Sequence, residues 1–320
     1  MTHHPARAAA LARAFVCAFV IALGLGPWSA SRASSTRYCD QSPTLSAAQQ
    51  DRLFRFAGVI KQTLEESGAS LALVSRSGLD LSRFGMRYSH AGVSLKQGLD
   101  TAWSVRQLYY DCDESKPRLF DQGVSGFVLG LSDPAAGYVS VVTLPEPEAA
   151  ALERAVLDRA LALRALGTRY SANAHAFSVA YQNCNQWVAE MLAGAWGPPP
   201  DPPDPLITAS IEARRQHAQA WLAQQGYQPS VFDVGFRPWM WLGRLIPHLH
   251  EDDHPAADLA QARFRVSMPA SIEAFVQARV LGARRLEFCQ ADTRIVIRRG
   301  WTPIAEGCVA GEQDTTITLE

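Results

Sequence analysis

The pattern of apolar residues changes along the chain from helical to strand-like and back, and this order constrains the fold more than any other feature. Residues 46–66 have helical spacing, with Ser46 placed to cap the helix. Strand-like segments follow at 70–74, 86–95, 102–110 and 138–144, and helical patterns return at 147–165 and 184–196. A helix, consecutive strands and two helices predict an α+β domain with an antiparallel sheet and packed helices.

The N-terminal segment has the three-part layout of a secretory signal peptide. A basic start is followed by the apolar run from Phe15 to Leu25 and by small residues up to Ala33. The run is too short to span a bilayer, and no second run of that length follows, so no integral membrane segment is expected after cleavage. We therefore expect residues 1–33 to be removed near Ala33 and the mature protein to be periplasmic or secreted.

The charge of the chain is balanced, with 30 basic and 31 acidic residues and a formal net charge of -1 at pH 7. Such a chain has no general field that would attract nucleic acid, so no nucleic-acid partner is expected. Apolar residues make up 48% of the sequence, which is enough to build a sizeable core. A globular protein with a locally defined site is the expectation.

A proline-rich segment at 197–206 interrupts the chain and is expected to be an extended linker. It would separate a first domain, residues 34–196, from a C-terminal α/β extension, residues 207–320. In that extension a helix is expected at 207–225, an aromatic-rich stretch at 231–246, and a β-α-β-β pattern at 264–299.

The cysteine count is odd once the predicted leader is removed, since Cys17 lies within it. Disulfides persist outside the cytosol, so one thiol is expected to remain unpaired. No pair of cysteines has the C-x-x-C spacing of a zinc ribbon or a thioredoxin-like site. The unpaired thiol is either a reactive group or simply a buried one.

Cys184 stands where a helix begins. Asn183 is a good N-cap residue, and Gln186 falls at the third helical position, which resembles a capping box. The unpaired N–H groups of a helix start favour a thiolate and can hold an oxyanion. A cysteine that starts a helix and faces the core would give the same pattern, so both interpretations stay open.

His90 and Gln107 lie on successive predicted strands. Alternation places His90 on the same face as Gly92 and Ser94, where no bulky side chain stands beside it, as is typical of a cleft. Gln107 on the next strand could orient the imidazole, although Gln107 taken alone fits an exposed amide on a sheet better.

These residues resemble the circularly permuted papain-like fold, which includes NlpC-type cell-wall peptidases and permuted amidases and lipid acyltransferases. More specifically, the chain resembles a bacterial family called domain of unknown function 2145. The resemblance rests on four runs in this sequence: Arg76-x-Gly78, Arg87-Tyr88-Ser89-His90-Ala91-Gly92, Tyr181-Gln182-Asn183-Cys184-Asn185-Gln186-Trp187 and Asp252-Asp253-His254-Pro255.

The resemblance implies roles for individual residues. Cys184 would be the nucleophile, His90 the general base and then acid, and Gln107 the orienting third member. Gln182 and Asn183 would support the oxyanion. The neutral Gln107 departs from the charged partner of many relatives, because it can orient an imidazolium but cannot stabilise its charge. Peptidoglycan peptides, proteins and acyl lipids are the substrate classes implied, and no cofactor is implied.

A free Cys184 would leave four mature cysteines to pair. Adjacency along the chain favours Cys39–Cys112 and Cys289–Cys308, with the other connectivities still open.

Two further interpretations compete with the enzyme. A non-catalytic periplasmic binding module would keep the same fold and use the cleft only for ligand. The run from His248 to His254 is dense in metal-ligand side chains and could form a divalent-metal centre, although its spacing is poor for one and metal ligation is not expected.

Overall fold

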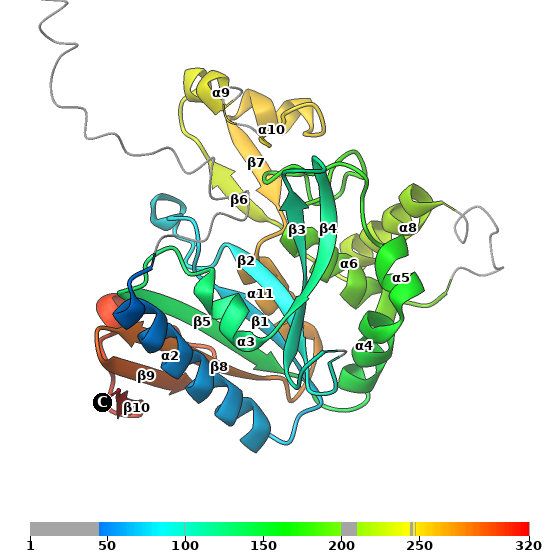
Figure 1. Ribbon diagram of the computed structural model, residues 1–320. Helices are drawn as coiled ribbons and strands as arrows, with labels where there is room; N and C mark the ends of the chain where they lie inside the picture. Colours follow the sequence, from blue (N-terminus) through cyan, green and yellow to red (C-terminus); the bar gives the residue numbers. More distant parts are fainter. Residues whose placement is uncertain (1–44, 99, 200–209, 244–245, 247, 320) are drawn as a thin grey trace, which may run out of the picture. The chain divides into compact units, whose positions relative to one another are not determined.

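The computed structural model describes residues 45–98, 100–199, 210–243, 246 and 248–319 (Figure 1). The expected signal peptide, Cys39 and most of the expected linker lie outside these residues. The described chain is built on an eight-stranded sheet in which every neighbouring pair for which a register is defined is antiparallel. In spatial order its strands are β10 (Thr315–Thr318), β9 (Arg294–Arg299), β8 (Arg284–Ala291), β5 (Ala136–Thr143), β1 (Leu71–Arg76), β2 (His90–Leu95), β3 (Ser104–Asp111) and β4 (Lys116–Gln122).

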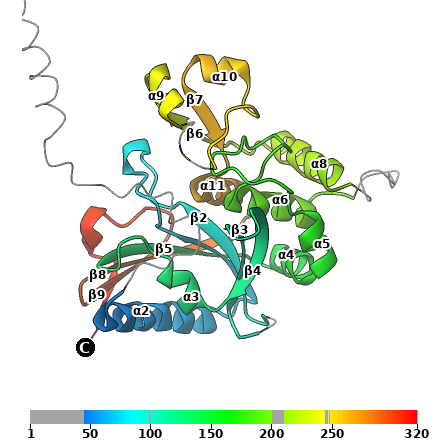
Figure 2. The same ribbon diagram turned by 45° about the horizontal axis from the view of Figure 1, so that its top comes forward.

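Helices cover both faces of this sheet, as Figure 2 shows. One face is covered by α2 (Ala47–Glu66) and α3 (Val124–Leu129). The other carries α4 (Glu148–Leu157), α5 (Arg159–Arg164), α6 (Cys184–Trp196), α8 (Ile211–Gln224) and α11 (Pro269–Arg279). The α+β class and the antiparallel sheet expected from the sequence are confirmed.

The alternation of side chains along β1 and β2 explains the two layers. Leu71 and Leu73 of β1 join the core under α6, while Ala72 and Val74 join the core under α2. Successive side chains of a strand point to opposite faces, so a strand buried on both sides is apolar throughout. On β2 the same rule places Ala91 under α6 and turns His90 toward the opposite face.

A small second sheet stands beside the main one. It pairs β6 (Ser230–Asp233) with β7 (Arg263–Val266) and is accompanied by the short helices α9 (Arg237–Gly243) and α10 (Ala256–Ala260). One-turn helices η2 (Ser82–Phe84) and η3 (Glu306–Cys308) complete the elements. The expected C-terminal extension, residues 207–320, contributes to both sheets: β6 and β7 form the small one, whereas β8 pairs with β5 in the main one. The domain limits at 196 and 207 stay a prediction.

Several element boundaries differ from expectation. The helix expected at 147–165 is two helices, because Asp158 leaves the helical conformation and caps α5 by accepting from the N–H groups of Ala160 and Leu161. The expectation missed β4, which contains Pro117 and several charged residues. Such a strand is tolerated at the edge of a sheet, and β4 is an edge strand.

The described cysteines fall into two states. Cys289 and Cys308 form a disulfide that ties β8 to η3, as predicted. Cys112 is also disulfide-bonded, but its predicted partner Cys39 lies outside the described residues, so that pairing stays a prediction. Cys184 is free and buried.

In the part of the chain that the structure describes, we find no helix with the length and apolar character needed to cross a membrane.

Candidate active site

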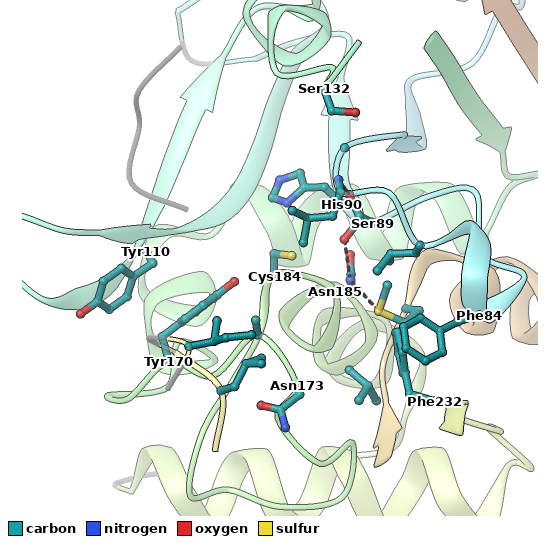
Figure 3. A pocket seen from close by; sticks show the side chains of 18 of the residues that line it. Phe84, Ser89, His90, Tyr110, Ser132, Tyr170, Asn173, Cys184, Asn185 and Phe232 are labelled. Carbon is teal, nitrogen blue, oxygen red and sulfur yellow. Dashed lines mark hydrogen bonds between the residues drawn. The ribbon is translucent and has the colours of Figure 1, made fainter. Parts of the chain in front are cut away.

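A cavity of about 680 Å³ opens beside the start of β2 and is lined by both His90 and Cys184. Figure 3 shows Cys184 near its centre, with Tyr110 and Tyr170 on one side, Phe84 and Phe232 on the other, and the His90 ring above the thiol. Concave sites of this size commonly bind small ligands. The structure therefore brings two of the three residues of the expected triad to one pocket.

Cys184 is the first residue of α6, as expected. Asn183 caps the helix, because its side-chain oxygen accepts from the N–H of Gln186 at 2.7 Å. The Gln186 side chain does not return to Asn183 as in a capping box. It donates instead to the carbonyl oxygens of His175, Ala176 and Ser178, and so holds the preceding loop against the helix.

The Cys184 thiol is not activated in this structure. Burial raises its pKa to about 11, because an apolar surrounding disfavours the thiolate. The positive charge of Arg76 and the backbone N–H groups of Asn185, Cys184 and Ala91 lower this pKa, but less than burial raises it. The helix start does favour the thiolate, as the sequence indicated, and desolvation outweighs it.

His90 and Gln107 form the contact that the sequence proposed. His90 Nε2 donates to Gln107 Oε1 at 2.7 Å, and both side chains are buried. Because an amide oxygen only accepts, the proton lies on Nε2 and Nδ1 keeps its lone pair. The ring stacks on Tyr109, with centroids 4.8 Å apart. Burial and then the Arg76 charge lower the pKa of His90 to about 3, and the bond to Gln107 opposes this shift.

Gly92 allows the two strands to approach at this point. A methyl group on Gly92 would lie 2.7 Å from Val105 Cγ1, which is too close, and 3.2 Å from Gln107 Cβ, which is a tight contact. Pairing of β2 with β3 is defined only from Val93, opposite Arg106, onward. The two strands therefore come close enough for the His90 ring to bond to Gln107. The start of β2, with His90, still lies beside the pocket.

Cys184 and His90 are neighbours without a direct bond. The Ala91 side chain belongs to the same core as Cys184, whereas the His90 ring turns to the other face and contacts Phe127. No hydrogen bond joins the Cys184 thiol to the His90 ring, both of which lie in the described chain. The pair is thus placed at one pocket with a neutral thiol and a neutral imidazole.

Arg76 is a site residue to which the sequence reasoning assigned no role. Its guanidinium donates to Gly130 O and to the Tyr109 hydroxyl, and it influences the pKa of both His90 and Cys184. A methyl group on Gly130 would lie 2.6 Å from the guanidinium carbon. In the sequence, only the Arg76-x-Gly78 run quoted for the family resemblance marked this residue. In the structure, a methyl group on Gly78 would lie 3.1 Å from Arg76 Nη1.

Gln182 and Asn183 do not line the pocket. The Gln182 amide accepts from the N–H of Gly167 and donates to Ala165 O and to Glu190 Oε2. The Asn183 amide nitrogen donates to Ala172 O and Ser267 O. Both amides are occupied within the fold, whereas the backbone N–H groups of Asn185, Cys184 and Ala91 act on the thiol and lower its pKa.

Asn185 is the polar side chain that does line the pocket beside Cys184. Its nitrogen donates to Ser89 O at 3.1 Å and contacts the Met268 sulfur at 3.6 Å (Figure 3). Its buried oxygen has no hydrogen-bond partner among the described residues. Its position directly after Cys184 was the only signal for it in the sequence.

The histidines of the run from His248 to His254 do not converge. His248 packs on Tyr110, His250 stacks on Tyr181, and His254 bonds to Asn173 O at 2.8 Å. Among the described residues, no group of three or more His, Cys, Asp or Glu side chains is arranged to hold a metal ion. The run ties the loop before α6 to the segment before α10.

Comparison with known proteins gives one match. A family model described as an uncharacterized protein conserved in bacteria (DUF2145) matches residues 63–276, which is more than half of the chain. No curated protein and no solved structure matches it. The matched range contains Arg76, His90, Gln107 and Cys184, so the residues of the pocket lie within the family's shared region. The chain therefore belongs to this bacterial family.

Proposed function

We propose that the protein is a cysteine-dependent acyl-transfer enzyme, a hydrolase or an acyltransferase, with Cys184 as nucleophile and His90 as base. One observation carries this proposal: the free thiol at the start of α6 opens into the same pocket as a histidine whose ring is held by Gln107. A nucleophile, a base and an orienting group are the parts that covalent acyl transfer needs. The order His90, Gln107, Cys184 along the chain supports a permuted papain-like arrangement.

The chemistry begins from two neutral groups. As the Cys184 sulfur attacks a carbonyl carbon, its proton passes to His90 Nδ1, and the carbonyl electron pair moves to the oxygen. The N–H groups at the start of α6 hold that oxyanion. On collapse, the bond to the leaving nitrogen or oxygen breaks, and Nδ1 returns the proton to it. Water or an acceptor alcohol or amine then takes the acyl group, and the sulfur regains a proton.

Proton transfer coupled to attack suits this site. A thiolate and an imidazolium formed separately would each be penalised by burial, as the pKa values of about 11 and about 3 indicate. Catalytic hydrogen bonds are often absent or long before substrate binds, and they shorten in the complex. We propose that a bound acyl group draws the thiol and the ring together.

We also propose that the mature protein works outside the cytosol. The Cys289–Cys308 disulfide and the disulfide-bonded Cys112 fit an oxidising compartment. The N-terminal segment with signal-peptide layout points the same way.

The proposal is tested with p-nitrophenyl acetate, followed by intact-mass analysis and peptide mapping. We expect saturable release of nitrophenol and an acetyl group on Cys184. His90→Ala should slow acetylation at least about a hundredfold. The matched control is His217→Ala on α8, which does not line the pocket and should acetylate at the wild-type rate. Acetylation that misses Cys184, or that proceeds equally in His90→Ala, would overturn the assignment.

A non-catalytic binding module is the second candidate. The missing hydrogen bond between Cys184 and His90, together with the unfavourable pKa values, favours it. In that case ligands would bind in the pocket while Cys184 stays unmodified in the acetylation experiment.

A further inference from the structure

We infer that the pocket at Cys184 binds the aliphatic chain of an acyl compound, with the carbonyl at the thiol and the chain beneath α9 and the β6–β7 sheet. This inference rests on the proposed function for the position of the carbonyl. The position of the aliphatic chain is inferred from the pocket alone.

The wall of the pocket away from His90 is apolar. Its residues come from the small sheet, from α9 and from the segments beside them: Phe84, Phe232, Val234, Trp239, Met240 and Phe264. Phe84 and Phe232 pack edge to face, with ring centroids 5.0 Å apart. Residues far apart in sequence thus combine into one apolar wall of the pocket that holds Cys184, and Figure 3 shows two of them, Phe84 and Phe232, side by side.

Three charged residues also line the pocket: Arg76, Arg83 and Glu251. The Arg76 guanidinium is buried and is bonded to Gly130 O and the Tyr109 hydroxyl. Arg83 lies over the Phe84 ring and donates to Val234 O at 3.4 Å. Both cations are thus engaged with the protein, and the apolar wall described above carries no charged side chain.

An aliphatic chain fits such a wall better than a peptide does. Each peptide group that enters an apolar pocket loses hydrogen bonds to water, and this loss is unfavourable unless the wall supplies partners. An alkyl chain loses none and gains from leaving water. The volume of about 680 Å³ is within the range of sites that enclose small ligands, so it has room for a chain as well as a reacting group.

The entrance is also apolar. Trp239 and Ile246 line the pocket and are 55% and 44% exposed, and Phe236, next to α9, is 60% exposed without lining the pocket. Exposed apolar residues gathered around an apolar pocket are typical of a ligand-binding site. Trp239 and Phe236 therefore form a matched pair: both are exposed aromatic residues at one helix, and only Trp239 faces the pocket.

The test uses the full chain with Cys184→Ala, so that binding is measured without chemistry. Octanoyl, dodecanoyl and hexadecanoyl monoglycerides, kept below their aggregation concentrations, are titrated by calorimetry. We expect affinity to rise about fourfold for each methylene until the pocket is filled. Trp239→Ala in this background should weaken dodecanoyl binding about tenfold, and Phe236→Ala should leave it unchanged.

Three results would overturn the inference: affinity that does not depend on chain length, equal effects of the two aromatic variants, or preferential binding of a soluble cell-wall stem peptide. The outcome is separable from the proposed function. Chain-length-dependent binding together with an unacylated wild-type Cys184 would uphold the pocket and reject the enzyme. Acetylation of Cys184 without chain-length dependence would do the reverse.

Discussion

Helix α6 carries two buried polar clusters that differ in how completely they are satisfied. In its middle, Glu190 accepts from Arg215, Gln219 and Gln182, and the Arg215 guanidinium also donates to three backbone carbonyl oxygens. At its start, Asn185 Oδ1 has no hydrogen-bond partner among the described residues, and the same is true of Gln107 Nε2 on strand β3.

The difference separates a structural cluster from a candidate binding site. Buried polar groups are normally paired, because an unpaired one keeps its full desolvation penalty. The Glu190 cluster closes on itself and fastens α8 and the loop before α6 to the helix. Asn185, next to Cys184, lines a pocket, where a ligand can supply the hydrogen bond that its side-chain oxygen lacks. The predictions below test this contrast.

The largest effect is expected from Glu190→Ala. The Glu190 and Arg215 side chains are 1% and 2% exposed, so the variant leaves a buried guanidinium without its counter-charge. We expect a loss of about 3–5 kcal/mol in the free energy of unfolding, measured with denaturant. The control is Asp51→Ala, which breaks an exposed ion pair with Arg55 and should change stability by less than about 1 kcal/mol. Similar losses in both variants would mean that the Glu190 cluster is not structural.

The second effect concerns the reactivity of Cys184. With a pKa of about 11, the thiol of the unliganded protein should be alkylated by iodoacetamide at pH 8 at least about a hundredfold more slowly than an ordinary thiol. The rate should climb steadily up to about pH 11. An inflection near or below pH 8.5 would show that the thiol is already activated before ligand binds.

The third effect is a pH dependence of stability due to His90. Its pKa is about 3 in the folded protein against an ordinary 6.5, so between these values the unfolded chain binds one more proton. The free energy of unfolding therefore falls as pH falls below about 6.5, by about 2 kcal/mol at pH 5.

Denaturant unfolding of wild type and His90→Ala at several pH values measures the contribution of His90 to the pH dependence of the free energy of unfolding. The variant should lose less stability than wild type between pH 7.5 and pH 5, and the two curves should run parallel between pH 7.5 and pH 9. Parallel curves at acidic pH as well would mean that His90 accepts a proton in the folded state and is more exposed to water than the structure shows.

The smallest effect is expected from Asn185→Leu. This change removes an unpaired buried oxygen and keeps a similar volume, at the cost of the hydrogen bond to Ser89 O and the weak one to the Met268 sulfur. We expect a change of less than about 1 kcal/mol in denaturant unfolding, with an unchanged slope. A loss comparable to that of Glu190→Ala would place Asn185 in the structural cluster and weaken the contrast.

Much of the fold followed from local patterns. The helices at Ala47–Glu66 and Cys184–Trp196 were expected with nearly these limits, because each has a capping residue and an apolar face. The strands β3 and β5 were expected because they are rich in β-branched and aromatic residues. Strand β4 and the break at Asp158 were missed, since an edge position and a local cap can override residue preference.

The candidate site was anticipated in part. The alternation along the strand placed His90 on the face of Gly92 and Ser94, and Gln107 on the next strand was expected to orient its ring; the hydrogen bond between the two side chains agrees with that. The same alternation turns His90 away from the face of the sheet on which α6 and Cys184 lie. This consequence follows only from the tertiary structure, which shows which face α6 covers. Arg76 and Asn185 were not assigned roles, because their importance comes from burial and from neighbours distant in the chain.

The sequence by itself determined the succession of helices and strands, the α+β class, the helix start at Cys184 and the membership of the bacterial family. These depend on periodicity, capping and local runs of residues. The tertiary structure decided that β8 joins β5, that an apolar pocket reaches Cys184, and that thiol and imidazole are both neutral there. Those features depend on desolvation and on contacts between distant segments, which no local pattern encodes.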